Sequence, residues 1–300
     1  MKQLIILVSI LFSVNCYAQS ADYQPDFKKP KKIKGMKLVW QDEFNADGKP
    51  NANFWKHENG FVRNNELQWY QPDNVICKNG LLVFDAQRVN KLNPNFVGFD
   101  SAQPTKNTQN WKTSREYITF TSSSIQTRGM KEWLFGTFFI RAKIDTTLGS
   151  WPAIWTLGSN GRWPQNGEID IMEFYRVKSA PTILANFCWG SATKSNGTWD
   201  DAKIALSHFT GKNKDWLNQF HIWQMDWNEK AIKIFLDDEL INEVNLSETL
   251  NPDGKNPFMQ PHYLLLNLAI GGNNGGEPCS TTQSIKYEVD YVRVYQKKNQ

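Results

Sequence analysis

Residues 166–174 read NGEIDIMEF, a stretch in which acids alternate with isoleucines. Side chains along an extended strand alternate between its two faces, so Glu168 and Asp170 share one face and the two isoleucines share the other. Strict alternation would place Glu173 with the isoleucines. A β-bulge after Asp170, which adds one residue to the strand, would rotate Glu173 onto the face of the other two acids. The stretch therefore predicts a bulged strand with one acidic face and one buried apolar face.

Segments with the alternation of β-strands recur along most of the chain, separated by clusters of Gly, Asn, Asp and Pro. Only two modest helices are expected, around residues 200–208 and 213–220. No internal period predicts repeats, and no Pro- or Ser-rich linker divides the chain. Many strands without alternating helices predict one all-β sandwich. Its strands are expected at residues 36–44, 80–88, 136–145, 221–227, 231–240, 262–270 and 287–296.

The N-terminus has the pattern of an export signal. Lys2 precedes an apolar run over residues 4–14, and Ala18 supplies the small residue expected at a cleavage site. The run is too short to cross a bilayer, so we expect an exported protein, whether periplasmic, cell-surface or secreted, with no membrane span. Cys16 also permits a lipoprotein, but Asn15 is a poor fit to the small residue that such signals carry before the cysteine. Ordinary export is favoured.

Composition divides the chain and excludes several classes of function. We expect a signal peptide over residues 1–18, a basic lead-in over residues 19–35 and one main domain over residues 36–298. The net charge of +4 is too small for a nucleic-acid-binding protein, because the one basic cluster lies in the lead-in and is expected to be solvated. Cleavage after the signal leaves three cysteines, which allow at most one intramolecular disulfide. No Cys or His spacing indicates zinc.

The three acids of residues 166–174 have two interpretations. Acids on an exposed strand face often serve only solubility. Here, however, acids are poor strand formers, two carboxylates on one face repel each other, and the neighbouring segments are apolar and rich in tryptophan. These features favour a cleft over an open surface. A metal site built from the same carboxylates lacks supporting histidines.

The spacing of the two glutamates indicates a reaction class. With a bulge, Glu168 and Glu173 are separated by four effective steps, or roughly 13 Å of strand at ~3.3 Å per residue. Side chains that lean toward each other would close the gap between the carboxyls to about 5–6 Å. Retaining glycosidases hold their two carboxyls about 5–5.5 Å apart, whereas inverting enzymes need a wider gap for a water molecule. The spacing favours retention.

The motif Glu-x-Asp-x-x-Glu in this stretch resembles the signature of glycoside hydrolase family 16, in its bulged, laminarinase-like branch. The resemblance extends over some 250 residues, in the order of that family. The matching segments are WQDEF (40–44), NNELQWY (64–70), TSSSIQTRG (121–129), FGTFFIRAKI (135–144), GSWPAIWTLG (149–158), LLLNLAIGG (264–272) and VDYVRVYQ (289–296).

The resemblance implies a β-jelly-roll sandwich with a concave glycan-binding cleft, in which residues 36–298 form the glycoside hydrolase catalytic domain. Glu168 is similar to the family's nucleophile and Glu173 to its general acid/base, while Asp170 lies between them and modulates their charges. Clustered carboxylates cannot all ionise cheaply, so one pKa is raised and that group holds a proton near neutral pH. No cofactor is expected for catalysis.

Aromatic and polar residues around the acids are candidates for sugar binding. Flat aromatic rings suit the apolar C–H faces of sugars, although each tryptophan has a core position as its alternative. Asn65 and Glu66 resemble residues that bind sugar hydroxyls on the glycone side, with loop capping as the alternative role for Asn65. The full set of candidates is Asn65, Glu66, Trp151, Trp155, Arg162, Trp163, Asn186 and Trp189. Of the tryptophans, Trp163 and Trp189 are the preferred cleft residues.

Family resemblance also implies a structural calcium ion on the convex face. The matching positions are Glu43, Gly80 and Asp290, where carboxylate and backbone oxygens would suit a hard cation. The alternative is an acidic loop that holds no ion. The protein is expected to be a monomer.

One departure from the family leaves the substrate open. Many laminarinase-like members have a histidine shortly before the tryptophan of the strand that follows the acids, and here Asn186 stands near that position. The leading expectation is a secreted, endo-acting, retaining β-glycoside hydrolase that cleaves a β-1,3 or mixed β-1,3/1,4 glucan by double displacement. The alternatives are the same mechanism on a galactose-containing glycan (an endo-β-galactosidase, galactanase or mucin O-glycanase) and a jelly roll that binds carbohydrate without cleaving it.

Overall fold

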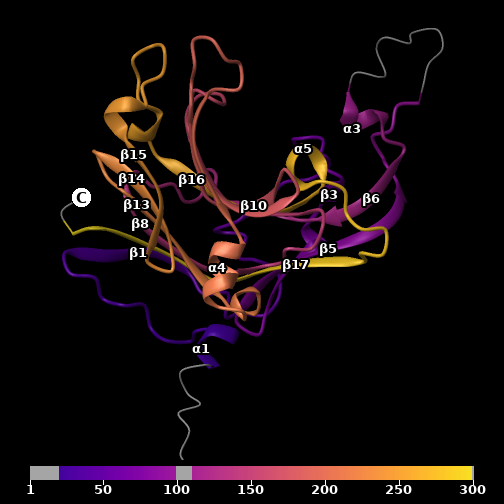
Figure 1. Cartoon of the computed structure of the whole chain (residues 1–300), viewed down its shortest axis with the longest axis horizontal. Coiled ribbons are helices and arrows are strands. Elements are labelled where there is room, and N and C mark those ends of the chain that lie inside the picture. Colours follow the sequence, from indigo (N-terminus) through magenta and orange to yellow (C-terminus); the bar gives the residue numbers. More distant parts are fainter. Residues whose placement is uncertain (1–19, 99–109, 299–300) are drawn as a thin grey trace, which may run out of the picture.

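Two β-sheets packed face to face form the framework of the described part of the chain (Figure 1). A computed structural model of the protein describes residues 20–98 and 110–298. The expected signal peptide and Cys16 lie outside the described residues. No helix in the described ranges is long and apolar enough to cross a membrane.

The larger sheet has ten strands among the described residues and is antiparallel except where β3 pairs with β6. Its main path runs β15, β14, β13, β8, β17, β5, β6, β3, with β1 on β17 and β4 on β5. The strands are β1 (Met36–Asp42), β3 (Gln68–Tyr70), β4 (Val75–Lys78), β5 (Leu81–Leu92), β6 (Tyr117–Ser122), β8 (Gly136–Ile144), β13 (His221–Trp227), β14 (Ala231–Leu236), β15 (Glu239–Asn245) and β17 (Ser284–Lys297).

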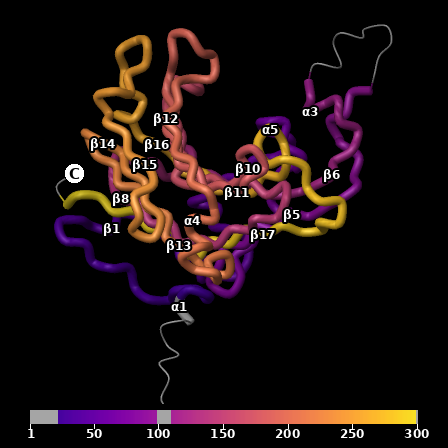
Figure 2. Tube along the Cα trace, viewed as in Figure 1, coloured from indigo at the N-terminus to yellow at the C-terminus, as the bar shows by residue number. Residues whose placement is uncertain are grey.

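The second sheet has seven strands in the same described ranges and follows the order β12, β11, β10, β9, β16, β7, β2. Strands far apart in sequence are neighbours in it, since β16 lies between β9 and β7. Strands β10 and β11, which pair along their length, lie side by side in the Cα trace (Figure 2). Its strands are β2 (Lys56–His57), β7 (Ser124–Gln126), β9 (Ser150–Gly158), β10 (Glu168–Val177), β11 (Ala180–Trp189), β12 (Thr198–Ala205) and β16 (His262–Ile270).

Short helices and 3₁₀ turns connect the strands. They are α1 (Ser20–Tyr23), α3 (Trp111–Ser114), α4 (Ser207–Lys212), α5 (Gly272–Gly275), η1 (Pro72–Asn74), η2 (Trp216–Asn218), η3 (Leu246–Glu248) and η4 (Pro257–Met259). The expected helix at 200–208 was wrong, because β12 occupies residues 198–205 and α4 only residues 207–212. At residues 213–220 only the 3₁₀ turn η2 forms. Pairing of the whole of β12 with residues 182–189 of β11 outweighs the weak helix propensity of this segment.

The core lies between the two sheets, as a jelly-roll sandwich requires. Strand β16 contributes side chains to both faces of the seven-stranded sheet. Leu264, Leu266 and Leu268 point into the core, whereas Asn267 and Ala269 line a cavity on the opposite face. Alternate residues of one strand thus fill the core and build the cavity floor. Cys77, Cys188 and Cys279 are all free thiols.

The lysines of the basic lead-in are exposed to solvent, as the sequence predicts. The backbone of the lead-in is nevertheless bound to the ten-stranded sheet. Arg141 and Arg293 donate to the carbonyl oxygens of Gln24 and Lys28 at 3.0 and 3.1 Å, and the Tyr295 hydroxyl donates to that of Lys31 at 2.9 Å. These hydrogen bonds hold the lead-in as a strap across the sheet.

Candidate active site

Strand β10 contains the bulge that the parity of its acids requires. Asp170 pairs with Asn186 of β11, but Glu173 pairs with Leu184, so three steps on β10 match two on β11. The register with β9 also shifts between Asp170 and Met172. Consequently Ile171 and Met172, although consecutive, both pack in the core. The extra residue returns Glu173 to the face of Glu168 and Asp170.

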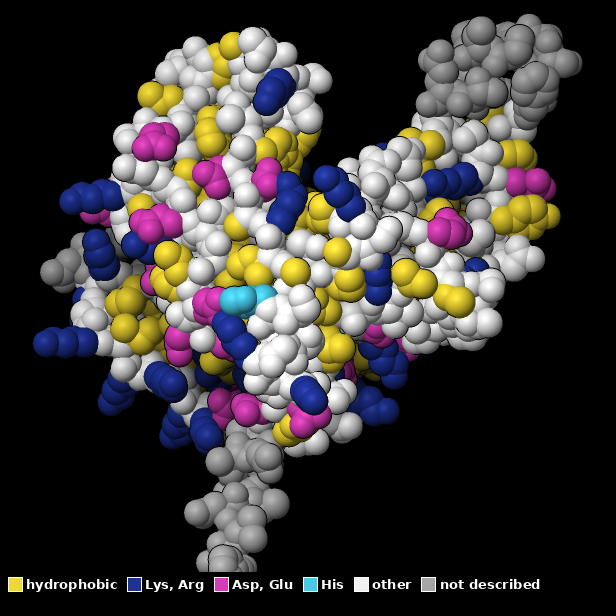
Figure 3. Space-filling view, in the orientation of Figure 1, with side chains coloured by type: hydrophobic (Ala, Val, Ile, Leu, Met, Phe, Trp, Pro, Cys, Tyr) yellow, Lys and Arg dark blue, Asp and Glu magenta, His cyan; other side chains and the backbone are white. Residues whose placement is uncertain are grey.

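That face opens into a cavity of about 660 Å³ above the seven-stranded sheet. In the space-filling view the surface is hollowed between the lobe at the upper left and the part that carries α3 (Figure 3). The size suits a site for several sugar rings. The cavity is lined by Arg63, Asn64, Glu66, Trp151, Ala153, Trp155, Leu157, Trp163, Glu168, Asp170, Glu173, Tyr175, Asn186, Asn196, Trp199, Asp201, Lys203, Asn267, Ala269, Asn273 and Asn274.

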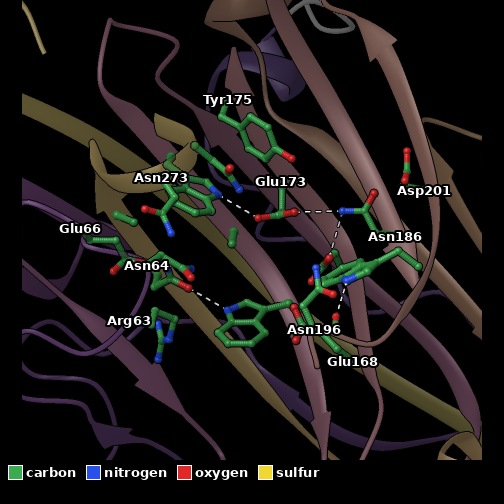
Figure 4. A pocket seen from close by; sticks show the side chains of 18 of the residues that line it. Arg63, Asn64, Glu66, Glu168, Glu173, Tyr175, Asn186, Asn196, Asp201 and Asn273 are labelled. Atoms are coloured by element: carbon green, nitrogen blue, oxygen red, sulfur yellow. Dashed lines mark hydrogen bonds between the residues drawn. The ribbon is translucent and has the colours of Figure 1, made fainter. Parts of the chain in front are cut away.

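Indole and amide N–H groups hold the two glutamates in place (Figure 4). Trp163 donates to Glu168 Oε2 at 2.5 Å, and Trp151 donates to Glu173 Oε1 at 2.8 Å. Asn186 Nδ2 donates to Glu173 Oε2 and to Asp170 Oδ2, both at 3.0 Å. Each carboxyl therefore has at least one fixed donor and a defined orientation.

Burial raises the pKa of all three acids above the usual range of carboxyl groups. For Glu168, burial and the charge of Glu173 raise the pKa to about 7, while hydrogen bonds from Trp163 and Asp170 act in the opposite direction. Burial and the charge of Glu168 raise the pKa of Asp170 well above its ordinary value. Burial and the charge of Asp170 do the same to Glu173. The site thus combines one carboxyl whose pKa lies near neutral pH with two whose pKa is raised by burial and by a neighbouring acid.

Several lining residues were missed by the sequence analysis. Arg63 places its guanidinium 5.0 Å from the ring centre of Trp155 and pairs with Glu58. Asn64 donates to Glu66 Oε1 at 3.3 Å. These side chains come from the turn before β3, where a positive φ of 56° at Asn64 bends the backbone. Both residues lie in the polar stretch VRNNELQWY (62–70), but the sequence alone did not show which of its two asparagines faces the cavity.

Eight of the eleven predicted catalytic and sugar-binding residues line the cavity in this structure, and three do not. Asn65 is directed to Asn273, whose Oδ1 accepts its hydrogen bond at 3.1 Å. Arg162 is exposed and lies outside the lining. Trp189 packs against the core instead of the cavity. Its position follows from parity, because Trp189 and Asn186 are three residues apart on one regular strand and must face opposite sides.

The residues predicted to hold calcium do not fit such a site. Both oxygens of Glu43 accept from Arg293, at 2.8 and 2.7 Å. Asp290 Oδ2 accepts from Arg141 at 2.5 Å. Gly80 has a φ of +77°, and an added Cβ would lie 2.7 Å from the Phe27 ring of the strap. Two guanidinium groups thus pair with the two carboxylates that were predicted to bind calcium.

We expect chelation to leave stability unchanged while loss of an arginine lowers it. Treatment with EDTA should not move the melting temperature. Arg141→Met leaves the buried Asp290 carboxylate without its charged partner and with only the Asp26 backbone N–H as donor, which should cost about 3 kcal/mol and lower the melting temperature by about 5–10 °C. Lys143→Met is the control on the same strand, because its pair with Glu288 is more exposed and contributes little. A fall of several degrees in EDTA would show that a metal ion, not arginine, stabilises this face. Calorimetry measures all three.

Comparison with known proteins identifies the family of the chain. A family model described as "Glycosyl hydrolases family 16" matches residues 69–293. The chain is similar to the beta-glucanase of Rhodothermus marinus, at 30% identity over 98% of this chain and 94% of that protein. It is also similar to the glucan endo-1,3-beta-glucosidase A1 of Niallia circulans, at 30% identity over 88% of this chain, which spans only 38% of that relative.

A solved structure is also similar to this chain. It comes from work on endo-acting O-glycanases that prominent members of the human gut microbiota express to initiate mucin breakdown. It superimposes with a TM-score of 0.78 at 31% identity and covers 90% of this chain and 94% of its own.

Proposed function

This chain belongs to glycosyl hydrolases family 16 and is a retaining endo-β-glycosidase, and we propose that it cleaves a β-1,3-glucan or a mixed β-1,3/1,4-glucan. One observation carries the chemical part of the proposal: the bulge in β10 presents Glu168 and Glu173 together to one cavity. The glucan part is supported by relatives named as glucanases that share about a third of its residues.

In the first step Glu168 is the nucleophile and Glu173 is the general acid. The Glu168 carboxylate attacks the anomeric carbon, and the bond from that carbon to the leaving oxygen breaks as Glu173 donates its proton to this oxygen. The raised pKa of Glu173 keeps that proton available. The hydrogen bond between Asp170 and Glu168 lowers the pKa of Glu168, which favours the ionised form of the nucleophile.

In the second step the same groups release the sugar. Glu173, now ionised, takes a proton from a water molecule, and the resulting hydroxide attacks the anomeric carbon. The ester bond to Glu168 breaks and its carboxylate is regenerated. Two displacements at one carbon restore the β configuration.

The pH profile should report these two roles. Glu168 must be ionised, and its pKa is raised to about 7, so kcat/KM should fall as pH drops below about 7. Glu173 must be protonated, so kcat/KM should also fall once pH rises through its raised pKa. The expected curve is bell-shaped, with an acid limb well above the pKa of an ordinary glutamate. Initial rates on soluble glucan over pH 4–10 measure it.

Variants of Asp170 identify the source of the acid limb. Asp170→Asn keeps a neutral hydrogen-bond donor for Glu168, so the limb should stay in place. Asp170→Ala removes the donor, so the limb should lie at higher pH than in Asp170→Asn. If the two variants have the same acid limb, Asp170 does not donate to the nucleophile.

Two exposed tryptophans form a platform at one end of the cavity. The ring centres of Trp163 and Trp199 lie 6.5 Å apart. The exposed fraction of the residue surface is 43% for Trp163 and 38% for Trp199. We expect Trp199→Ala to raise KM about 3- to 10-fold with little change in kcat, because a lost sugar–ring contact is worth roughly 0.5–1.5 kcal/mol. Leu240→Ala, which removes an exposed apolar side chain away from the cavity, should leave KM unchanged. An unchanged KM in Trp199→Ala contradicts the platform. Steady-state kinetics on glucan oligosaccharides decide.

A galactose-containing glycan is the second candidate substrate. The structure from work on mucin O-glycanases has a TM-score of 0.78 to this chain, which favours this candidate. Asn186 in place of the family's histidine is consistent with a changed cleft. A panel of laminarin, lichenan, agarose, porphyran and mucin O-glycans, with sizing of the products, separates the candidates. Oligosaccharides from laminarin or lichenan support the glucan, activity confined to the galactose-containing glycans overturns it, and products that are only monosaccharides overturn the endo mode.

We also propose that the protein acts outside the cytoplasm as a monomer. The apolar run at residues 4–14 supports export, and the strap shows how the chain after residue 19 remains attached to the domain. Cell fractionation and size-exclusion chromatography with light scattering test the two parts. Mature protein in the cytoplasm, or a mass twice that of the chain, would contradict them.

A further inference from the structure

The side chain of Asn186 lies between two of the three acids (Figure 4). It projects from β11 directly opposite Asp170 and is only 4% exposed. Its single amide nitrogen carries two hydrogens, and both are used: one on Asp170 Oδ2 and one on Glu173 Oε2. A neutral group thus supplies positive dipole to two neighbouring carboxyls without adding a charge.

The bulge makes this bridge necessary. Beyond the extra residue, Glu173 is paired with Leu184, two positions along β11 from Asn186. Backbone pairing alone therefore fixes the strand at Glu173 but not the direction of its carboxyl. Trp151 holds one oxygen of that carboxyl from β9, and Asn186 holds the other from β11. The carboxyl of the general acid thus accepts hydrogen bonds from both neighbouring strands.

The other end of the amide indicates that this role is not structural. Asn186 Oδ1 is buried, and no described residue donates a hydrogen bond to it. An unpaired buried acceptor is unfavourable, and an apolar side chain of the same size would avoid it. The side chain is therefore oriented by the two acids alone.

We infer that Asn186 is a positioning residue for the general acid: it fixes the Glu173 carboxyl in the cavity and favours the ionised forms of Glu173 and Asp170. The inference rests on the proposed role of Glu173 as general acid. Loss of the amide should free the carboxyl to rotate and should raise its pKa further, because a donor to the charged form is removed.

The test compares Asn186→Leu with Asn186→His and the wild type. Leucine has nearly the same volume and no donor, whereas histidine restores an N–H. On oligosaccharides, Asn186→Leu should lower kcat about 10- to 100-fold with little change in KM, the usual range for impaired proton transfer. On a 2,4-dinitrophenyl glycoside, whose leaving group needs no proton, the loss at the glycosylation step should be less than about 3-fold.

The pH profile gives a readout that a merely structural role would not change. In Asn186→Leu the alkaline limb of kcat/KM should move to higher pH, and Asn186→His should return it part of the way. Thr182→Val, on the same face of β11 but outside the cavity, is the matched control and should change neither rate nor limb. Circular dichroism and melting curves confirm that each variant is folded.

Two outcomes overturn the inference. An equal loss of rate on both substrates, or an alkaline limb that does not move while the rate falls, would show that Asn186 supports the fold only. Failure of the proposed function looks different: Glu173→Ala would then lose the same rate on both substrates, whatever residue stands at position 186.

Discussion

Glu168→Gln should abolish turnover while leaving glycan binding intact. The amide is nearly isosteric with the acid but cannot displace a leaving group, so kcat should fall by about 10⁴-fold or more, as when other enzymes lose a nucleophile. The variant should fold normally, because burial already disfavours the charge of Glu168 and a neutral amide removes that charge. Reducing-end assays measure turnover, and calorimetric titration with oligosaccharide measures binding.

This result also separates an enzyme from a carbohydrate-binding module. A jelly roll that only binds sugars would show no turnover to lose, and a variant that cleaves as fast as the wild type would refute the mechanism. Chemical rescue adds a sharper test with Glu168→Ala. Azide fits the space left by the side chain and attacks the anomeric carbon from the same face, while Glu173 protonates the leaving oxygen. The product should be an α-glycosyl azide, because only one displacement occurs.

The alternation of side chains along a strand correctly predicted the bulge in the acidic stretch. Alternation along NGEIDIMEF required a bulge after Asp170, and the structure has its register shift there. The same argument, applied to β11, would have placed Trp189 in the core, because it lies three residues from Asn186. Preference for a flat ring near the acids led instead to a cleft position. Strand periodicity is a local property of the chain, so it predicts the face of a side chain better than residue type does.

Other features depend on contacts that no local pattern contains. Arg141 and Arg293 neutralise Asp290 and Glu43 from separate positions along the chain, and the strap lies across them. Sequence spacing cannot show that Asp290 and Glu43 are each paired with an arginine. Strand β12 was likewise missed. Its residues alternate as strand residues do, as at Trp199, Asp201 and Lys203, but the pairing with β11 that stabilises the strand is a tertiary contact that the local pattern does not contain.

Glu173→Ala should impair cleavage according to the leaving group. For a glucan, whose leaving oxygen needs a proton, kcat/KM should fall by about 10³- to 10⁴-fold, the upper range for loss of a general acid. For a 2,4-dinitrophenyl glycoside the first step should proceed at close to the wild-type rate, because this leaving group departs without protonation. Pre-steady-state release of dinitrophenol measures that step separately from hydrolysis of the intermediate.

Removal of Glu173 should also slow the second step, since no base remains to activate water, and the glycosyl-enzyme intermediate should accumulate on Glu168. Azide needs no base, so it should restore turnover of the dinitrophenyl glycoside. It attacks the intermediate from the face opposite Glu168, and the product should be a β-glycosyl azide, the opposite anomer to that from Glu168→Ala. The two anomers assign the two glutamates independently of any rate. If Glu173→Ala gave the α-azide, the roles of Glu168 and Glu173 would have to be exchanged, although both side chains still face one cavity because of the bulge in β10.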